Sequence, residues 1–356
     1  MSFFSTTEKA FGLDISDKTL RLIQLVKNGK KIKIKHFNEI TLPTDCVVNG
    51  EIKKIEPFVE SLKKLIKTRI GRGTISNEVV AVLPEAETFL KTLYIAAEDE
   101  ISLQDKIKEE IKLHLPLDIE EIYYDWQLVE KINGIYTIIL GASPKKIVDS
   151  YIEALEAANL IPVVIEIEAA AISHLLIDFN QDQQTQIVID IGANRTGLFL
   201  YDRGMIKFTV SLPISGKELD NIIAESLDLE IDKAEEAKIT FGLDANQANG
   251  ALFEVLTPTI EELVQQIKLA IEFYYENFND TRLIEQIVLC GGGANFINIE
   301  NILSQKLKIK VLKSQPFKKL INPDPKFFTE SKSQSFITAI GLALRGLASE
   351  TFYDYH

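Results

Sequence analysis

Residues 188–200 read VIDIGANRTGLFL, two apolar runs separated by a short polar segment, with an aspartate near the end of the first run. Apolar runs on either side of such a break predict two antiparallel strands joined by a tight turn. Asp190 stands at the end of the first strand, before Gly192, Ala193, Asn194 and Thr196. A carboxylate beside a turn of small residues is suited to hold a metal-bound phosphate, because backbone N–H groups of the turn can face the phosphate oxygens. A plain hairpin is the competing interpretation of one such loop.

The same plan occurs near the start of the chain. Residues 11–37 (FGLDISDKTLRLIQLVKNGKKIKIKHF) and 187–213 (IVIDIGANRTGLFLYDRGMIKFTVSLP) both read strand, aspartate, polar turn, strand, glycine turn and strand. Internal similarity about half a chain apart predicts two halves built alike, each beginning with a three-stranded meander. In the first copy the aspartate is Asp14, and the turn contains Ser16, Asp17, Lys18 and Thr19.

A glycine turn forms the third element of the pattern. Residues 287–303 (IVLCGGGANFINIENIL) predict a strand, the turn Gly291, Gly292 and Gly293, and a helix. Three successive glycines remove the side chains where a ligand group can lie against backbone. The turn is not a Walker loop, because no Gly-Lys-Ser/Thr follows it.

Helical periodicity predicts a helix over 56–70 and a longer one over 257–278, with Thr257 as its cap and Pro258 at its first position. The aromatic residues of the second helix are expected to pack in a core. Between 84 and 162 the order strand, acidic helix, strand, KING turn, strand and helix predicts a small α+β subdomain.

Composition excludes several classes of function. The chain of 356 residues has a net charge of −13, which argues against broad binding to nucleic acid or anionic membranes, since both need a basic face. Two distant cysteines and four scattered histidines show no metal-binding spacing. Without a signal peptide or an apolar run of about 18 residues, a cytosolic location is expected.

The two aspartate loops and the glycine turn, in this order, resemble the actin-like ATPase superfamily. The resemblance implies an α/β actin-like fold: two ribonuclease-H-like domains around a nucleotide cleft, with a small α+β insert. The expected parts are residues 1–83 (first half of domain 1), 84–162 (partner-binding insert), 163–186 (hinge and connecting helix), 187–334 (domain 2) and 335–356 (closing helix and tail).

The resemblance also implies roles for individual residues, with ATP or ADP and Mg²⁺ as the bound groups. Asp14 and Asp190 would hold Mg²⁺ through water, and Glu168 stands where the superfamily often orients the attacking water, although a structural role for Glu168 is an equal alternative. The nucleotide-binding positions are Asp14, Ser16, Asp17, Lys18, Thr19, Gly192, Ala193, Asn194, Thr196, Gly216, Glu235, Lys238, Gly291, Gly292 and Gly293. Ser16 and Asp17 replace the usual glycine and hydroxyl residue, so binding with at most slow ATP hydrolysis is expected.

Over residues 11–347 the ordered motifs are similar to the PilM family of type IV pilus assembly proteins, which is related to FtsA. This implies an ATP-binding scaffold that binds the N-terminal cytoplasmic tail of the inner-membrane protein PilN through the insert. Other pilus components, including the assembly ATPase, and self-association stay open as partners. Nucleic acid and direct membrane insertion are not expected, and the location would be cytoplasmic, peripheral to the inner membrane through protein partners. An actin-like small-molecule kinase and an FtsA-like filament-forming protein are the alternatives.

Overall fold

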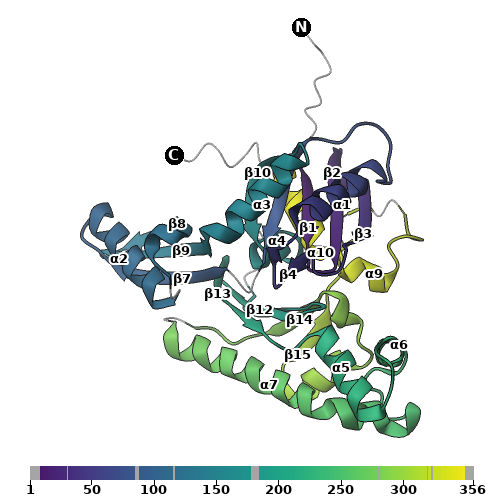
Figure 1. Ribbon diagram of the computed structural model, residues 1–356. Coiled ribbons are helices and arrows are strands. Elements are labelled where there is room, and N and C mark those ends of the chain that lie inside the picture. Colours follow the sequence, from purple (N-terminus) through teal and green to yellow (C-terminus); the bar gives the residue numbers. More distant parts are fainter. Residues whose placement is uncertain are drawn as a thin grey trace. The chain divides into compact units, whose positions relative to one another are not determined.

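The computed structural model describes residues 9–29, 31–84, 88–114, 117–177, 184–278, 281–318, 320–321 and 324–348. These residues form two compact units (Figure 1). Unit 1 draws on residues 1–178, 316–329 and 336–356, and unit 2 on residues 179–315 and 330–335. The domain boundaries expected from the sequence stay predictions. Part of the expected hinge (178–183) and the tail (349–356) lie outside the described residues.

Unit 1 is built on a mixed sheet. Its strands are, in spatial order, β10 (Ile161–Ile167), β6 (Glu78–Leu83), β1 (Phe11–Ile15), β2 (Thr19–Asn28), β3 (Lys31–Thr41) and β16 (Leu320–Ile321). Its helices are α1 (Ile55–Lys67), α3 (Lys145–Ala157), α4 (Glu168–Leu176) and α10 (Ile337–Ala348), and a small ribbon joins β4 (Val47–Val48) to β5 (Glu51–Ile52).

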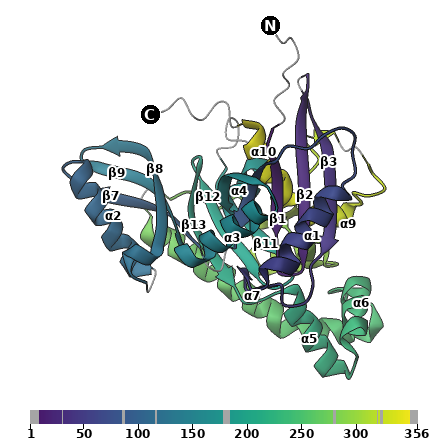
Figure 2. The same cartoon turned by 45° about the horizontal axis from the view of Figure 1, so that its top comes forward.

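The two faces of this sheet are covered by different helices. Side chains alternate along a strand, so Phe11 and Leu13 of β1 face one side, where they join a core that also contains residues of α1 and α3. Gly12 faces α10 on the other side, and a Cβ there would lie 2.3 Å from the Ala339 carbonyl oxygen. The absence of a side chain at Gly12 therefore lets α10 pack directly on β1. Figure 2 shows α1 lying across β2 and β3.

Within the insert predicted over 84–162, three antiparallel strands are neighbours in the order β7, β9, β8. Its elements are β7 (Phe89–Ala96), α2 (Glu100–His114), the 3-10 turn η2 (Ile119–Glu121), β8 (Ile122–Ile132) and β9 (Ile135–Pro144). Leu103, Ile107 and Ile111 recur every four residues along α2 and are fully buried in the insert's core. Asn133 and Gly134 both have positive φ, which confirms the predicted hairpin turn.

Unit 2 repeats the arrangement of unit 1. Its strands are, in spatial order, β15 (Lys310–Lys313), β14 (Gln286–Cys290), β11 (Gln186–Ile191), β12 (Thr196–Asp202) and β13 (Met205–Leu212). Its helical elements are α5 (Gly216–Leu227), α6 (Ile231–Phe241), η3 (Ala248–Gly250), α7 (Ala251–Asn277), η4 (Gly292–Asn295), α8 (Ile299–Leu307) and α9 (Glu330–Gln334).

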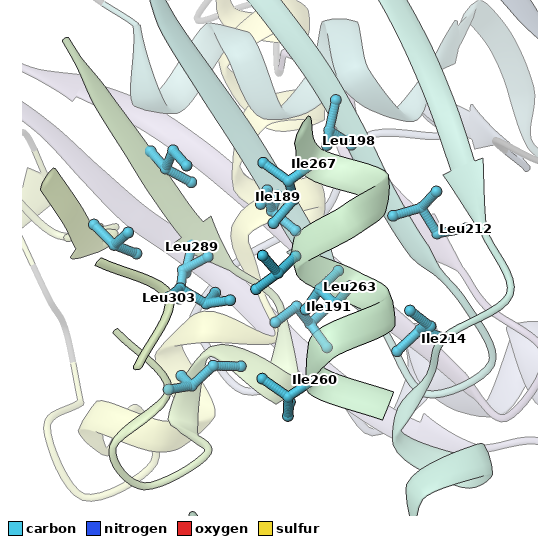
Figure 3. Close-up of a cluster of buried hydrophobic side chains, with 14 of the residues drawn as sticks. Ile189, Ile191, Leu198, Leu212, Ile214, Ile260, Leu263, Ile267, Leu289 and Leu303 are labelled. Carbon is cyan, nitrogen blue, oxygen red and sulfur yellow. The ribbon is translucent and has the colours of Figure 1, made fainter. Parts of the chain in front are cut away.

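The predicted duplication is confirmed by strand pairing. β1 and β11 each begin an antiparallel three-stranded meander, and each pairs on its other side with a parallel strand, β6 or β14. In unit 2 the long helix α7 lies over the sheet (Figure 3). Ile260, Leu263 and Ile267 of α7 belong to the same buried core as Ile189 and Leu198 of the strands.

Two predicted helix boundaries were wrong. The helix expected to start at Thr257 starts at Ala251, and Pro258 lies inside it. Buried Leu252, Leu256 and Ile260 form a continuous stripe, and their packing outweighs the cost of about 3 kcal/mol for an interior proline. The helix expected over 56–70 ends at Lys67, because the backbone of Ile70 pairs with Phe37 of β3.

A buried carboxylate holds the far end of the unit 2 sheet. Asp202 accepts hydrogen bonds from Thr185 Oγ1 (2.8 Å), Tyr274 Oη (3.0 Å) and Arg282 Nη2 (2.7 Å). Burial opposes ionisation of Asp202, but these donors outweigh it and lower the pKa of the carboxyl below its ordinary value. The carboxylate thus links β12 to α7 and to the segment before β14.

We expect Asp202→Asn to lower the free energy of unfolding by about 2–3 kcal/mol at neutral pH, because Arg282 loses its charged partner. A lowered carboxyl pKa contributes stability that is present above the unfolded-state pKa and is lost as pH falls through the folded-state pKa. Urea unfolding at pH 7 and in acid should therefore show the difference from the wild type shrinking below about pH 4. Glu272→Gln, an exposed position on α7, is the matched control. An equal difference at both pH values would contradict this assignment.

Candidate functional site

Loop 2, residues 192–195 between β11 and β12, is a closed turn. The Gly192 N–H donates to the Arg195 carbonyl oxygen at 2.9 Å, and a Cβ at Gly192 would lie 2.8 Å from that same oxygen. Ala193 and Asn194 are exposed at the tip. Among the described residues, the Ala193 N–H has no acceptor. Loop 2 therefore presents at least one backbone donor at its tip, and its role in phosphate binding stays a prediction.

The start of α5 packs on loop 2. The Gly216 N–H donates to the Gly192 carbonyl (3.1 Å), and the Lys217 N–H donates to the Ala193 carbonyl (2.9 Å). The Glu218 N–H donates to the side chain of Ser215, the residue that caps the helix. The first two of these donors, which at a free helix end would be available to an anion, thus fix the position of loop 2, and the third is used by the helix cap.

Lys238 lies at the same place, although it comes from α6. Its Nζ donates to the Gly216 carbonyl at 2.9 Å and forms an ion pair with Asp220 at 2.6 Å. Glu235, one turn earlier on α6, is exposed. The structure therefore brings Lys238 beside loop 2, and it reveals Asp220 as a partner that the sequence analysis missed.

Two of the three glycines of the 291–293 turn are required by packing. Gly291 has φ +77°, and a Cβ there would lie 2.0 Å from Asp190 Oδ1. A Cβ at Gly293 would lie 2.2 Å from Ile191 Cγ2, whereas a Cβ at Gly292 would meet no atom within 4 Å. Gly291 and Gly293 thus seat the turn against the end of β11, and Gly292 leaves backbone open toward solvent. Of the three, Gly292 alone has no packing reason to be glycine.

Asp190 is half-buried at the end of β11, where it pairs across the sheet with Gly197 and, on the other side, with Cys290. Thr196 is buried, and its hydroxyl donates to the Ile214 carbonyl at 2.7 Å, which ties β12 to the segment before α5. Unit 2 therefore brings together Asp190, loop 2, Lys238 and the glycine turn, and their predicted roles in nucleotide binding stay predictions.

Loop 1, residues 16–18 between β1 and β2, is closed by side chains. Ser16 Oγ lies 2.9 Å from Thr19 Oγ1 and accepts from the Thr19 N–H at 3.1 Å. The Asp17 carboxylate accepts from the N–H groups of Asn49 (3.1 Å) and Gly50 (2.9 Å), while Lys18 is exposed. Asp17 is thus held by the turn between β4 and β5. No local sequence pattern predicts this contact.

Asp14 is buried in a charged cluster. Its Oδ2 accepts from Arg21 Nη1 at 3.1 Å, and Arg21 Nε donates to Glu39 Oε2 at 2.7 Å. Burial raises the pKa of the Asp14 carboxyl above its ordinary value, and the Arg21 guanidinium opposes that rise. A cation of the chain itself therefore already faces Asp14, which weighs against direct metal coordination there.

The two meanders differ in the residues that lie opposite their aspartates across the sheet. Asp14 lies opposite Arg21, and Arg21 lies opposite Glu39. The equivalent series in unit 2 is Asp190, Gly197 and Ser211. The sequence analysis missed Arg21, although aligning the two meanders by their aspartates would have found it.

Glu168, the candidate catalytic residue, is the first residue of α4 in unit 1 and is half-buried. Among the described residues, no three His, Cys, Asp or Glu side chains gather as a metal site. The arrangement therefore offers phosphate-binding backbone and single carboxylates, and its catalytic role stays a prediction.

Comparison with known proteins supports this reading of the fold. A family model for "Type IV pilus assembly protein PilM" matches residues 12–347. The solved "PilM-PilN type IV pilus biogenesis complex" superposes with a TM-score of 0.80, at 23% identity over 95% of this chain and 98% of that chain. MreB5 of Spiroplasma citri bound to ADP superposes with a TM-score of 0.53, at 13% identity over 97% of this chain and 99% of that chain. These likenesses show an actin-like fold.

The cell division protein FtsA of Staphylococcus epidermidis matches a smaller part of the chain. It is 23% identical over 185 residues, which are 47% of this chain and 38% of FtsA. The chain thus spans well under half the length of this curated relative.

The glycine turn allows a direct test of packing. We expect Gly293→Ala to lower the free energy of unfolding by about 1–3 kcal/mol, because its Cβ overlaps Ile191. Gly292→Ala, one residue away and facing open space, should change it by less than about 0.5 kcal/mol and is the matched control. Urea unfolding of both variants measures the difference. Equal destabilisation would show that the turn is not seated on β11 as described.

Proposed function

We propose that this chain, which belongs to the type IV pilus assembly protein PilM family, is a nucleotide-binding actin-like scaffold. It binds the N-terminal cytoplasmic tail of PilN and links that tail to the pilus machinery. The observation that carries the proposal is the match of the family model to residues 12–347. The solved PilM-PilN complex, which shares the fold over 95% of this chain, supports it.

The proposed location is the cytoplasmic face of the inner membrane, reached through protein partners. No helix in the described part of the chain has the length and apolarity needed to cross a bilayer. Attachment through the tail of a membrane protein is consistent with that finding.

Nucleotide binding is proposed at the residues gathered in unit 2. The Ala193 N–H would donate to a phosphate oxygen, with Lys238 adding positive charge at the start of α5. Gly292 would let an adenosine ring lie against backbone, since nothing occupies the space where a side chain would project. The fold neighbour MreB5 was solved with ADP and, separately, with AMPPNP.

Asp190 is the proposed Mg²⁺ anchor, through water. Because Gly291 has no side chain, the glycine turn approaches the Asp190 Oδ1 closely, and the residues opposite Asp190 in the sheet, Gly197 and Cys290, are not basic. A bound Mg²⁺ would neutralise phosphate charge. Asp14 faces Arg21 instead, so we propose Asp190 rather than Asp14 as the metal anchor. Hydrolysis is proposed to be slow.

We expect Asp190→Ala to weaken binding of a fluorescent ATP analogue with Mg²⁺ by about tenfold, the effect of one charge-assisted contact. Fluorescence anisotropy measures the dissociation constant. Asp232→Ala, which removes an exposed carboxylate on α6, is the control. Unchanged affinity in a variant that keeps its thermal stability would remove the phosphate assignment from Asp190.

The insert offers an edge for the tail. β8 ends its sheet, pairing with β9 on one side only among the described strands. Residues 117–130 contain five acidic residues and no basic one. Leu128, Val129 and Ile132 are exposed along the same strand. An unpaired, acidic and partly apolar edge suits an extended basic peptide, which can add as a further strand. This edge is our candidate for the tail-binding site within the insert.

We expect Glu121→Lys with Glu130→Lys to weaken binding of a peptide copied from the cytoplasmic PilN tail by about tenfold or more, because rim charges steer and hold a basic ligand. Isothermal titration calorimetry with the whole chain gives the affinity. Glu272→Lys with Glu276→Lys makes the same charge change on exposed α7 and should leave it intact. Full affinity in the β8 variant would move the tail away from this edge, and no binding by the wild type would defeat the scaffold proposal.

A further inference from the structure

Charge is distributed unevenly along this acidic chain. Residues 27–72 contain twelve Lys and Arg but five Asp and Glu, a net charge of +7, whereas the whole chain carries −13. The other residues together therefore carry −20. The chain therefore contains one strongly basic segment although its net charge is negative. The argument from net charge against binding to anionic surfaces does not apply to this segment.

The fold gathers part of this segment on one face of unit 1. Lys31, Lys33 and Lys35 alternate along β3, so their side chains leave the same side of the sheet. That side is the one covered by α1, since Lys33 pairs with Val26 while Asn38, further along, donates from Nδ2 to the Leu65 carbonyl of α1. Figure 2 shows the β2–β3 hairpin extending beyond α1. The lysines near the hairpin end are therefore not covered by that helix.

The loop after α1 adds to this face because it is fastened to β3. Ile70 and Phe37 exchange two backbone hydrogen bonds (2.9 and 3.0 Å). Lys35 Nζ donates to the Thr74 carbonyl at 2.9 Å, and Arg69 donates to the Gly73 carbonyl at 3.0 Å. These bonds hold the loop 68–74 beside the lysine-bearing strand and fix the position of Arg72.

We call the exposed side chains of Lys31, Lys33, Lys67 and Arg72 the basic face. Within the part of the chain that the structure describes, these four cations have no ion-pair partner. Neighbouring carboxylates therefore do not neutralise them. Ile70 is not part of this face, because its pairing with Phe37 places its side chain on the opposite side of the sheet.

We propose that the basic face binds the surface of a bilayer containing anionic lipids. Four uncompensated cations on one exposed face match a layer of anionic headgroups. Nucleic acid fits less well, because single-stranded binding uses exposed aromatic rings, and Phe37 and Phe58, the only aromatic residues in 27–84, are both buried.

The acidic remainder of the chain does not prevent this contact. At physiological ionic strength charges interact over about 8 Å, so the bilayer responds to the face that touches it. The remaining −20 charge is repelled and would orient unit 1 with the basic face toward the lipid. The contact goes beyond the proposed attachment through PilN and needs neither nucleotide nor tail peptide.

The test is co-sedimentation of the whole chain with phosphatidylcholine vesicles that contain phosphatidylserine. Wild type should bind these vesicles, bind pure phosphatidylcholine weakly, and lose binding at high salt. Each basic residue near an anionic surface strengthens binding about fivefold, so Lys31→Glu with Lys33→Glu should weaken it by at least about 25-fold. Lys268→Glu with Lys310→Glu makes the same charge change at exposed positions of unit 2 and should retain binding.

A second ligand separates lipid from other polyanions. At the same salt concentration, wild type should bind the phosphatidylserine vesicles more tightly than a DNA duplex, and the β3 variant should lose the vesicle binding. Thermal unfolding verifies that each variant is folded. The proposal is overturned if wild type does not distinguish the two vesicle types, if both charge variants bind alike, or if the β3 variant loses binding to DNA but not to vesicles.

Discussion

The parallel pairing of β14 with β11 is the constraint on which the candidate site depends. In-register pairing of Asp190 with Cys290 brings the next residues, Gly291 to Gly293, to the end of β11. Any side chain at Gly291 or Gly293 would overlap Asp190 or Ile191, so the strand ends can meet only because both positions are glycine. Loop 2 is then fixed by backbone bonds from the first turn of α5, which also brings Lys238 into place. One strand pairing thus collects residues from four separate parts of the chain.

The equivalent meander of unit 1 carries different residues around its aspartate. Asp14 occupies the position of Asp190, but the residue opposite it is Arg21 rather than Gly197, and a second carboxylate, Glu39, completes a buried cluster. Buried charges that lack a partner are costly, so this cluster holds its members in place. Loop 1 is closed by hydroxyl groups, and Asp17 is held by the adjacent ribbon. The two halves therefore share a topology and differ in their electrostatics.

Unit 1 also carries two oppositely charged surfaces of its own. The edge of β8 carries acidic and exposed apolar residues, and the basic face beside α1 carries four exposed cations. We have proposed a basic peptide as the partner of the first surface and an anionic layer as the partner of the second, because opposite charges attract.

The sequence by itself determined the duplicated meander, the insert's order of elements and the three loops, because strand alternation, turn residues and helical periodicity are local properties of the chain. It also singled out Asp190, Gly192, Lys238 and the glycine turn as candidate site residues, and their roles stay predictions. The start of α7 was wrong because buried leucines outweigh the local signal of Pro258. Only the tertiary structure decided that Arg21 faces Asp14, that Asp17 binds the 49–50 backbone and that Ile70 pairs with Phe37. Strand register and packing across the sheet bring the residues of each contact together. The residues that neighbour them in the chain determine neither the register nor the packing.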